Sequence, residues 1–262
     1  MSIASKLSSP NIKHAAIYYF HSAFVVTCLT FCAYLVMKRV AFFKYCNTKR
    51  RTSSGNDNES IPLSTYLAIA KSIFPLLFAI WLNMFSTLAI FPVYNLGVVP
   101  NENGFLGDWF HDVVTFATFN IFVTVGNLMP RLVRWPGPKY LPYAVGLRAL
   151  CVFLFFSFSN YMPNERTLPV FVSNDYVYWF GCAISPLLFG YFTSLLMMYT
   201  PQYDFIFFVS CIFFFKFNLV FVYRQVEVKH AGTAAMMAGL VLAIGVASGL
   251  QFTMALDKLA KL

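Results

Sequence analysis

Six long apolar stretches, separated by short polar segments, dominate the pattern of this chain. Each has about 20 residues or more, the length that an α-helix needs to cross the hydrocarbon core of a membrane. The pattern therefore predicts an all-α fold, a polytopic bundle of transmembrane helices. We place the six spans at about residues 15–37, 63–94, 113–134, 141–161, 176–199 and 231–256.

The third stretch carries the most informative polar pattern. On a helix, Phe116, Asn120, Val123 and Asn127 fall at i, i+4, i+7 and i+11 and share one face. The amides need partners, because an unpaired polar group in hydrocarbon costs several kcal/mol. They either bond to neighbouring helices or line a polar path for a solute. Three other side chains of this stretch are predicted to point elsewhere: Phe119, Phe122 and Leu128.

Composition and charge support a membrane location and set an orientation. The chain is 59% hydrophobic and only 11% charged, whereas soluble domains are about 25% charged. Its net charge is +9, but the basic residues form short runs between apolar stretches, which indicates topology and not nucleic-acid binding. The run with the most basic residues places the loop 38–60 in the cytoplasm. The segment 97–112 has no Lys or Arg and is expected outside.

The sequence shows no pattern typical of an enzyme, a metal site or a cofactor site. The six cysteines have no CxxC or Cys/His spacing, so we expect them to be packing residues. The four histidines fall in four different segments, and no phosphate-binding glycine loop is present. We therefore predict a protein that is not an enzyme and needs no cofactor.

Individual residues predict where the helices bend and where they pack closely. Pro75 and Pro92 should kink or end the second stretch. Arg148 falls within the fourth stretch, where we expect its side chain to snorkel or pair at the cytoplasmic side. Gly245 and Gly249 form a GxxxG motif in the last stretch, which predicts a face of close helix packing.

One further apolar segment, 204–222, does not fit the pattern. It is rich in Phe, Ile and Val, but Lys216 would lie close to its middle. One hypothesis is translated non-coding sequence, such as a retained intron. The alternative is a genuine extra span, which would invert the last helix and move its end to the cytoplasm.

Short motifs along the chain resemble the C-terminal half of the equilibrative nucleoside transporter family. The resemblance is strongest in the third stretch and at its exit, and it continues in order on both sides. The motifs are AAIYYFHSAFVV at 15–26, Ile90-Phe91-Pro92, FNIF at 119–122, Gly126, RWPGP at 134–138, Arg148, Gly190-Tyr191 and AAMMAGLVLAIGVASG at 234–249.

The resemblance implies a fold of eleven helices, six before and five after a cytoplasmic loop. This chain would begin at the sixth helix, so that the loop 38–60 corresponds to the central loop. We divide the chain into a polar N-terminus, 1–14, and a partial transmembrane transporter domain, 15–262. The segment 204–222 would interrupt the short connection between the last two helices.

The resemblance also implies a substrate-binding site. In the family, an aromatic residue at the Phe-Pro motif lines the cavity, and this position is Phe91 here. Positions in the eighth helix that match Phe116 and Asn120 face the substrate, and Val246 matches a cavity position in the eleventh helix. The amide of Asn120 has an alternative role in a helix–helix bond.

At two positions the chain departs from the family's pattern. An Asp and an Arg that bond the sugar hydroxyls in the family correspond to Val123 and Asn127. A valine has no hydrogen-bonding group, and an asparagine offers a neutral amide in place of a guanidinium fork. We keep Asn127 as a candidate contact, and we expect a substrate with fewer hydroxyls, a nucleobase or another uncharged solute.

We therefore predict facilitated transport of nucleosides or nucleobases by alternating access, by a partial chain in the plasma membrane. The expected partners are the substrate, the lipid bilayer and either an N-terminal half or a full-length transporter, without nucleic acid. The alternative is a non-transporting membrane scaffold or regulatory fragment of a full-length transporter, because a transporter cavity lies between two helix bundles.

Overall fold

The computed structural model describes residues 12–41, 44–45, 63–100, 106–161, 170–200 and 231–260. Within these ranges the regular secondary structure is helical, and extended segments meet only at two isolated bridges, Val98 with Tyr161 and Ser159 with Val172. The all-helical prediction is confirmed for these residues. The chain divides into two compact units, Met1–Ile61 and Pro62–Leu262, each of which is considered by itself.

The first unit contains one long helix, α2 (Ile12–Arg39). Its bounds agree with the apolar stretch at 15–37, and its last turn holds Lys38 and Arg39. At 28 residues, it is longer than the ~20 residues that a membrane crossing needs. Its described side chains are exposed within the unit, and Thr30 donates its hydroxyl to the carbonyl of Val26 at 2.8 Å.

In the second unit, the stretch at 63–94 forms three helices: α4 (Leu63–Ser72), α5 (Phe74–Leu88) and α6 (Val93–Leu96). Pro75 lies in the first turn of α5, where its missing N–H leaves no helical bond unmade. Pro92 caps α6 after the turn that ends α5. Both prolines therefore break the stretch, as predicted.

The third stretch is less regular than its sequence predicts. It begins with a 3₁₀ turn, η1 (Gly107–Trp109), continues as a π-helix, η2 (His111–Ala117), and then as an α-helix, α7 (Thr118–Leu128). A final 3₁₀ turn, η3 (Met129–Arg131), precedes the exit. In a π-helix each turn takes in one additional residue, so side chains four apart no longer lie above one another.

Three long helices complete the second unit: α8 (Leu141–Ser157), α9 (Asp175–Tyr199) and α10 (Ala231–Ala260). All three begin close to the predicted positions. The side chain of Asn174 caps α9 by accepting the N–H of Tyr176 at 2.9 Å. The helix continues through Pro186, where the ring removes one backbone donor.

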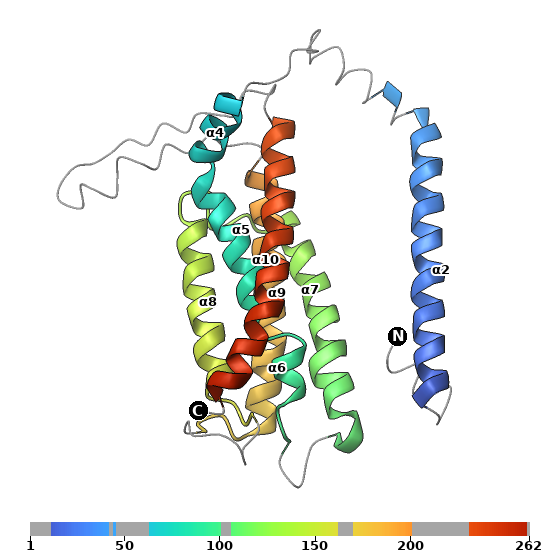
Figure 1. The fold of residues 1–262 in the computed structure, drawn as a ribbon, viewed down its shortest axis with the longest axis vertical. Coiled ribbons are helices and arrows are strands. Elements are labelled where there is room, and N and C mark those ends of the chain that lie inside the picture. Colours follow the sequence, from blue (N-terminus) through green and yellow to red (C-terminus); the bar gives the residue numbers. More distant parts are fainter. Residues whose placement is uncertain are drawn as a thin grey trace, which may run out of the picture. The chain divides into compact units, whose positions relative to one another are not determined.

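In the part of the chain that the structure describes, four segments are long and apolar enough to cross a membrane, and α8 is a shorter apolar helix. The four are Phe74–Leu96, His111–Arg131, Asp175–Tyr199 and Gly232–Ala255. In Figure 1 the long helices of this unit run alongside one another. The apolar segment 204–222 lies outside the described residues.

Glycines let two pairs of helices approach closely. Gly126 on α7 faces the backbone of α9, and Gly190 on α9 faces the backbone of α7, so neither position has room for a Cβ. On α10, a Cβ at Gly245 would lie 2.9 Å from Cβ of Met84, and one at Gly249 would lie 2.9 Å from the carbonyl oxygen of Phe85. The GxxxG motif therefore packs against α5, as predicted.

The buried core consists of two apolar clusters with a polar layer between them. Along α8, Leu141 and Val145 belong to the first cluster, and Val152 and Phe156 belong to the second. Arg148 falls between the two pairs. The helix α9 also contributes to both clusters, and α5 contributes to the first. Polar groups of both helices contact Arg148 between the two clusters.

Candidate functional site

The polar layer is built around the guanidinium of Arg148, which is only 4% exposed. Nη1 donates to Oδ1 of Asn83 at 2.9 Å and to Oγ of Ser86 at 3.4 Å. Nη2 donates to Oγ1 of Thr87 at 2.9 Å and to the carbonyl oxygen of Ser185 at 3.1 Å. The prediction that Arg148 snorkels is therefore wrong, because acceptors on α5 and α9 hold it inside the bundle.

Arg148 is a buried cation that is surrounded by neutral dipoles. Its guanidinium also lies over the ring of Phe189, with 5.6 Å between Cζ and the ring centroid. Its Nε has no hydrogen-bond partner. No carboxylate among the described residues pairs with it. Removing a charge from water costs several kcal/mol, and hydrogen bonds to neutral acceptors offset that cost here.

Asn83 connects the polar layer across two helices. The residue is fully buried, and its Oδ1 accepts from Arg148 while its Nδ2 donates to Oγ1 of Thr193 at 2.9 Å and to the carbonyl oxygen of Phe189 at 3.3 Å. Sequence reasoning missed this residue. The sequence does indicate a polar face on α5, because Asn83, Ser86 and Thr87 fall at i, i+3 and i+4.

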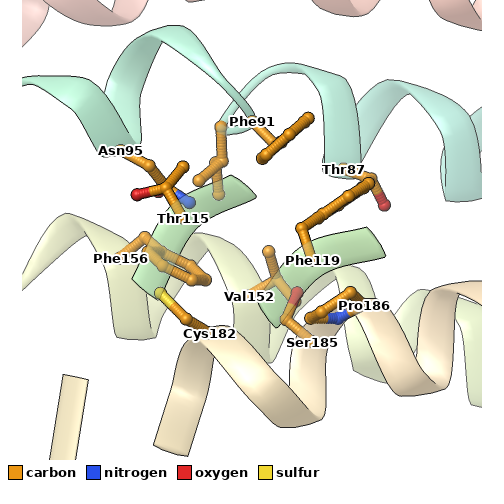
Figure 2. A pocket seen from close by; sticks show the side chains of 11 residues that line it. Thr87, Phe91, Asn95, Thr115, Phe119, Val152, Phe156, Cys182, Ser185 and Pro186 are labelled. Atoms are coloured by element: carbon orange, nitrogen blue, oxygen red, sulfur yellow. The ribbon is translucent and has the colours of Figure 1, made fainter. Parts of the chain in front are cut away.

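Next to the polar layer lies a small cavity of about 20 Å³, which is room for about one water molecule. Figure 2 shows the side chains around it, contributed by α5 and the turn into α6, by η2 and α7, and by α8 and α9. They are Thr87, Ile90, Phe91, Asn95, Thr115, Phe119, Val152, Phe156, Cys182, Ser185 and Pro186.

Two interruptions of regular helix and a proline within a helix meet at this cavity. The turn between α5 and α6 supplies Ile90 and Phe91, the π-helix η2 supplies Thr115, and the proline position of α9 supplies Ser185 and Pro186. π-Helical turns occur frequently at functional sites, and interrupted helices form the substrate sites of many transporters. The cavity is therefore the candidate functional site of this unit.

Aromatic rings form one wall of the cavity. The rings of Phe91 and Phe119 are stacked, with centroids 3.7 Å apart and planes at 7°. The ring of Phe116 meets Phe91 edge-on at 5.8 Å. The sequence predicted that Phe119 points away from the face of Phe116, but both contact Phe91, because residues three apart on a helix lie on neighbouring positions of its surface. Phe91 and Phe116, both predicted site residues, are thus brought together.

The two asparagines of α7 are exposed on the surface of the described bundle. Nδ2 of Asn120 donates to the carbonyl oxygen of Phe116 at 2.8 Å, which is one turn back in the same segment. Oδ1 of Asn127 accepts from Oγ of Ser194 on α9 at 3.1 Å. Asn127 therefore makes a helix–helix bond, while Asn120 is satisfied by its own helix.

The remaining predicted residues lie away from the cavity. Val246 is half-buried on α10 and does not line the cavity that the described residues form. The free cysteines differ in their surroundings: Cys182 is buried at the cavity, whereas Cys28, Cys32 and Cys151 are exposed. Packing inside the protein therefore accounts for Cys182 and not for the other three.

Long apolar helices, a buried polar layer and a cavity at helix interruptions define a multi-pass membrane protein. Residues 1–205 match the family model described as "Nucleoside transporter", and the chain belongs to this family. The match ends beside the apolar segment 204–222. The family consists of transporters and not of enzymes, which confirms the prediction that the chain is not an enzyme.

Two curated proteins are similar to this chain. It is 24% identical to equilibrative nucleoside transporter 1 of Homo sapiens over 283 aligned residues, which cover 96% of this chain and 57% of the human protein. It is 27% identical to equilibrative nucleoside transporter 1 of Rattus norvegicus over 154 residues, 56% of this chain and 32% of the rat protein. The chain thus spans a little over half the length of the human relative.

Proposed function

We propose that the chain takes part in facilitated transport of nucleosides or nucleobases across the plasma membrane, by alternating access. The family match over residues 1–205 supports this most directly. The cavity at two helix interruptions is the second support, because interrupted helices position the substrate in transporters. In this proposal α2 and α8 also cross the membrane, which brings the number of spans to six.

Within this proposal, Phe91 and Phe116 form the aromatic side of the substrate path together with Phe119. A planar heteroaromatic base gains contact area against such rings. Asn120 and Asn127 are exposed on α7, where they offer neutral hydrogen-bonding groups to a solute that passes along that face. Val246 is the candidate contact from α10.

The chemistry at two positions favours a nucleobase over a ribonucleoside. Val123 and Asn127 stand where the family has an acidic and a basic residue. Neither can form the charge-assisted bonds that hold sugar hydroxyls most strongly. A substrate with fewer hydroxyls loses less binding free energy when these bonds are missing.

A partner is part of this proposal, because the human relative is longer than the region that aligns here. The part of the relatives that this chain does not match would supply the second bundle. Such a bundle can come from a further segment or from a separate chain. If the exposed face of α7 remains uncovered, the chain acts instead as a non-transporting scaffold or regulatory fragment.

Uptake into proteoliposomes tests the proposal. The 262-residue chain is reconstituted alone and together with the full-length human relative, and uptake of labelled adenine and uridine is measured. We expect the chain and the full-length protein together to give saturable, gradient-driven uptake above that of the full-length protein alone, with the additional uptake larger for adenine than for uridine. A chain that gives no uptake alone and lowers uptake by the full-length protein would be a regulatory fragment, and the transport proposal would fail.

A further inference from the structure

Two polar side-chain atoms at the cavity have no hydrogen-bond partner. They are Oδ1 of Asn95 and Oγ1 of Thr115, on residues that are 5% and 1% exposed. Both residues line the cavity, and Figure 2 shows them together at one end of it. A buried polar atom without a partner costs about 1–3 kcal/mol, so the native bundle retains a group that does not stabilise its packing.

Other threonines of the bundle show that such an atom is avoidable. Thr200 donates its hydroxyl to the carbonyl of Leu196 at 2.7 Å, and Thr253 donates to that of Gly249 at 3.2 Å. Each hydroxyl is satisfied within its own helix. Thr115, in the π-helix η2, makes no bond of this kind. Its hydroxyl is therefore available to another molecule.

The surroundings of the cavity disfavour a positively charged group. Thr87 and Ser185 line its wall and also accept hydrogen bonds from Arg148. The positive charge directly behind that wall disfavours a cation in the cavity, since like charges repel strongly at low dielectric constant. A carbonyl oxygen such as Oδ1 of Asn95 accepts hydrogen bonds only, whereas the hydroxyl of Thr115 can donate as well as accept.

We propose that Asn95 and Thr115 form the recognition site for the hydrogen-bonding edge of a nucleobase. This inference rests on the proposed function. Oδ1 of Asn95 accepts an N–H of the base, and the Thr115 hydroxyl donates to the neighbouring ring nitrogen or carbonyl. The cavity has room for a group about the size of one water molecule, such as the amino group at the edge of a base. The ring itself lies against Phe91, which requires the stacked rings of Phe91 and Phe119 to separate.

Paired ligands test this site in the 262-residue chain purified in detergent. Adenine presents an amino group beside a ring nitrogen, and purine lacks only the amino group. Equilibrium binding of both is measured for the unaltered chain and for Asn95→Leu and Thr115→Val. We expect the unaltered chain to prefer adenine roughly tenfold, the effect of about one hydrogen bond. Asn95→Leu should bring the preference close to one.

Thr115→Val provides the variant that separates binding from folding. It removes an unpartnered hydroxyl and keeps the shape, so thermal stability should be unchanged or higher while adenine affinity falls severalfold. Thr200→Val is the matched control, because Thr200 is fully buried and away from the cavity. Its adenine preference should equal that of the unaltered chain.

The outcomes distinguish this inference from the function on which it rests. If the chain binds adenine and both cavity variants keep the full preference over purine, the cavity holds at most a structural water, and the inference is wrong while the proposed function stands. If the unaltered chain binds neither adenine nor purine, the recognition site is wrong, and the proposed function is decided separately by the uptake of adenine and uridine.

Discussion

The guanidinium of Arg148 lies 2.9 Å from Oδ1 of Asn83, and the two residues come from different helices of the bundle. Asn83 also bonds to α9 through Thr193. The pair therefore connects α8, α5 and α9 at one level of the apolar core. Because both residues are buried, removing one leaves the polar groups of the other without water to replace the lost bond.

This pair predicts that substitutions of Asn83 and of Arg148 lower the stability of the protein by unequal amounts. Asn83→Leu leaves a buried cation with fewer acceptors and should lower the free energy of unfolding by about 3–5 kcal/mol. Arg148→Met removes the charge together with its desolvation cost and should be milder. Combining the two should recover part of the stability of Asn83→Leu. Thermal unfolding in detergent measures all three, and strictly additive losses would contradict the coupling.

The interface between α10 and α5 predicts that alanine substitutions at different glycines of α10 have opposite effects on stability. Alanine at Gly245 or Gly249 places a Cβ within 3 Å of α5 and should cost about 1–3 kcal/mol through overpacking. Gly239 has open space around it, so Gly239→Ala should be neutral or stabilise by up to about 1 kcal/mol. The midpoint of thermal aggregation compares the three variants, and equal effects would refute the close approach.

The stack of Phe119 on Phe91 predicts which phenylalanine of the third span affects ligand binding. With the base between the separated rings of Phe91 and Phe119, Phe119→Ala removes one of its two stacking partners and should weaken adenine binding about fivefold to tenfold, since an aromatic pair is worth about 0.5–1.5 kcal/mol. Phe122→Ala is the control, because Phe122 does not line the cavity. If Phe122→Ala had the larger effect, the ligand would not bind against Phe91 and Phe119.

Asn127 and Ser194 allow the two roles of the α7 amides to be separated. If Asn127 serves only helix packing, Asn127→Ala and Ser194→Ala should show a coupling of about 0.6 kcal/mol in stability and leave transport unchanged. If Asn127 also contacts the solute, Asn127→Ala should lower adenine affinity and Ser194→Ala should not. Uptake and thermal stability, measured on the same preparations, distinguish these results.

The helix positions were predictable from sequence because each span is a long apolar run with polar ends. α9 begins at Asp175 and ends at Tyr199, within one residue of the predicted limits, and Pro75 and Pro92 break the second stretch where their missing donors require it. The π-helix was not predictable in this way. It depends on one additional residue in a turn, which no apolar pattern reveals.

The candidate site was only partly predictable for a different reason. Phe91 and Phe116 were found through a family motif, and the structure places them in contact. The partners of Arg148 come from α5 and α9, and no pattern within α8 identifies them. Asn95 and Thr115 are ordinary polar residues in sequence. They become informative only once their burial and lack of partners are known.

The polar layer also sets the axial register of the bundle. Apolar side chains on neighbouring helices can interlock at more than one offset, because their attraction has little directional preference. A slide of one turn, about 5.4 Å, would carry the acceptors of α5 out of reach of the guanidinium of Arg148. Arg148 therefore holds α5, α8 and α9 at one axial offset. It resists sliding of these helices past one another and allows them to tilt about the level of the guanidinium.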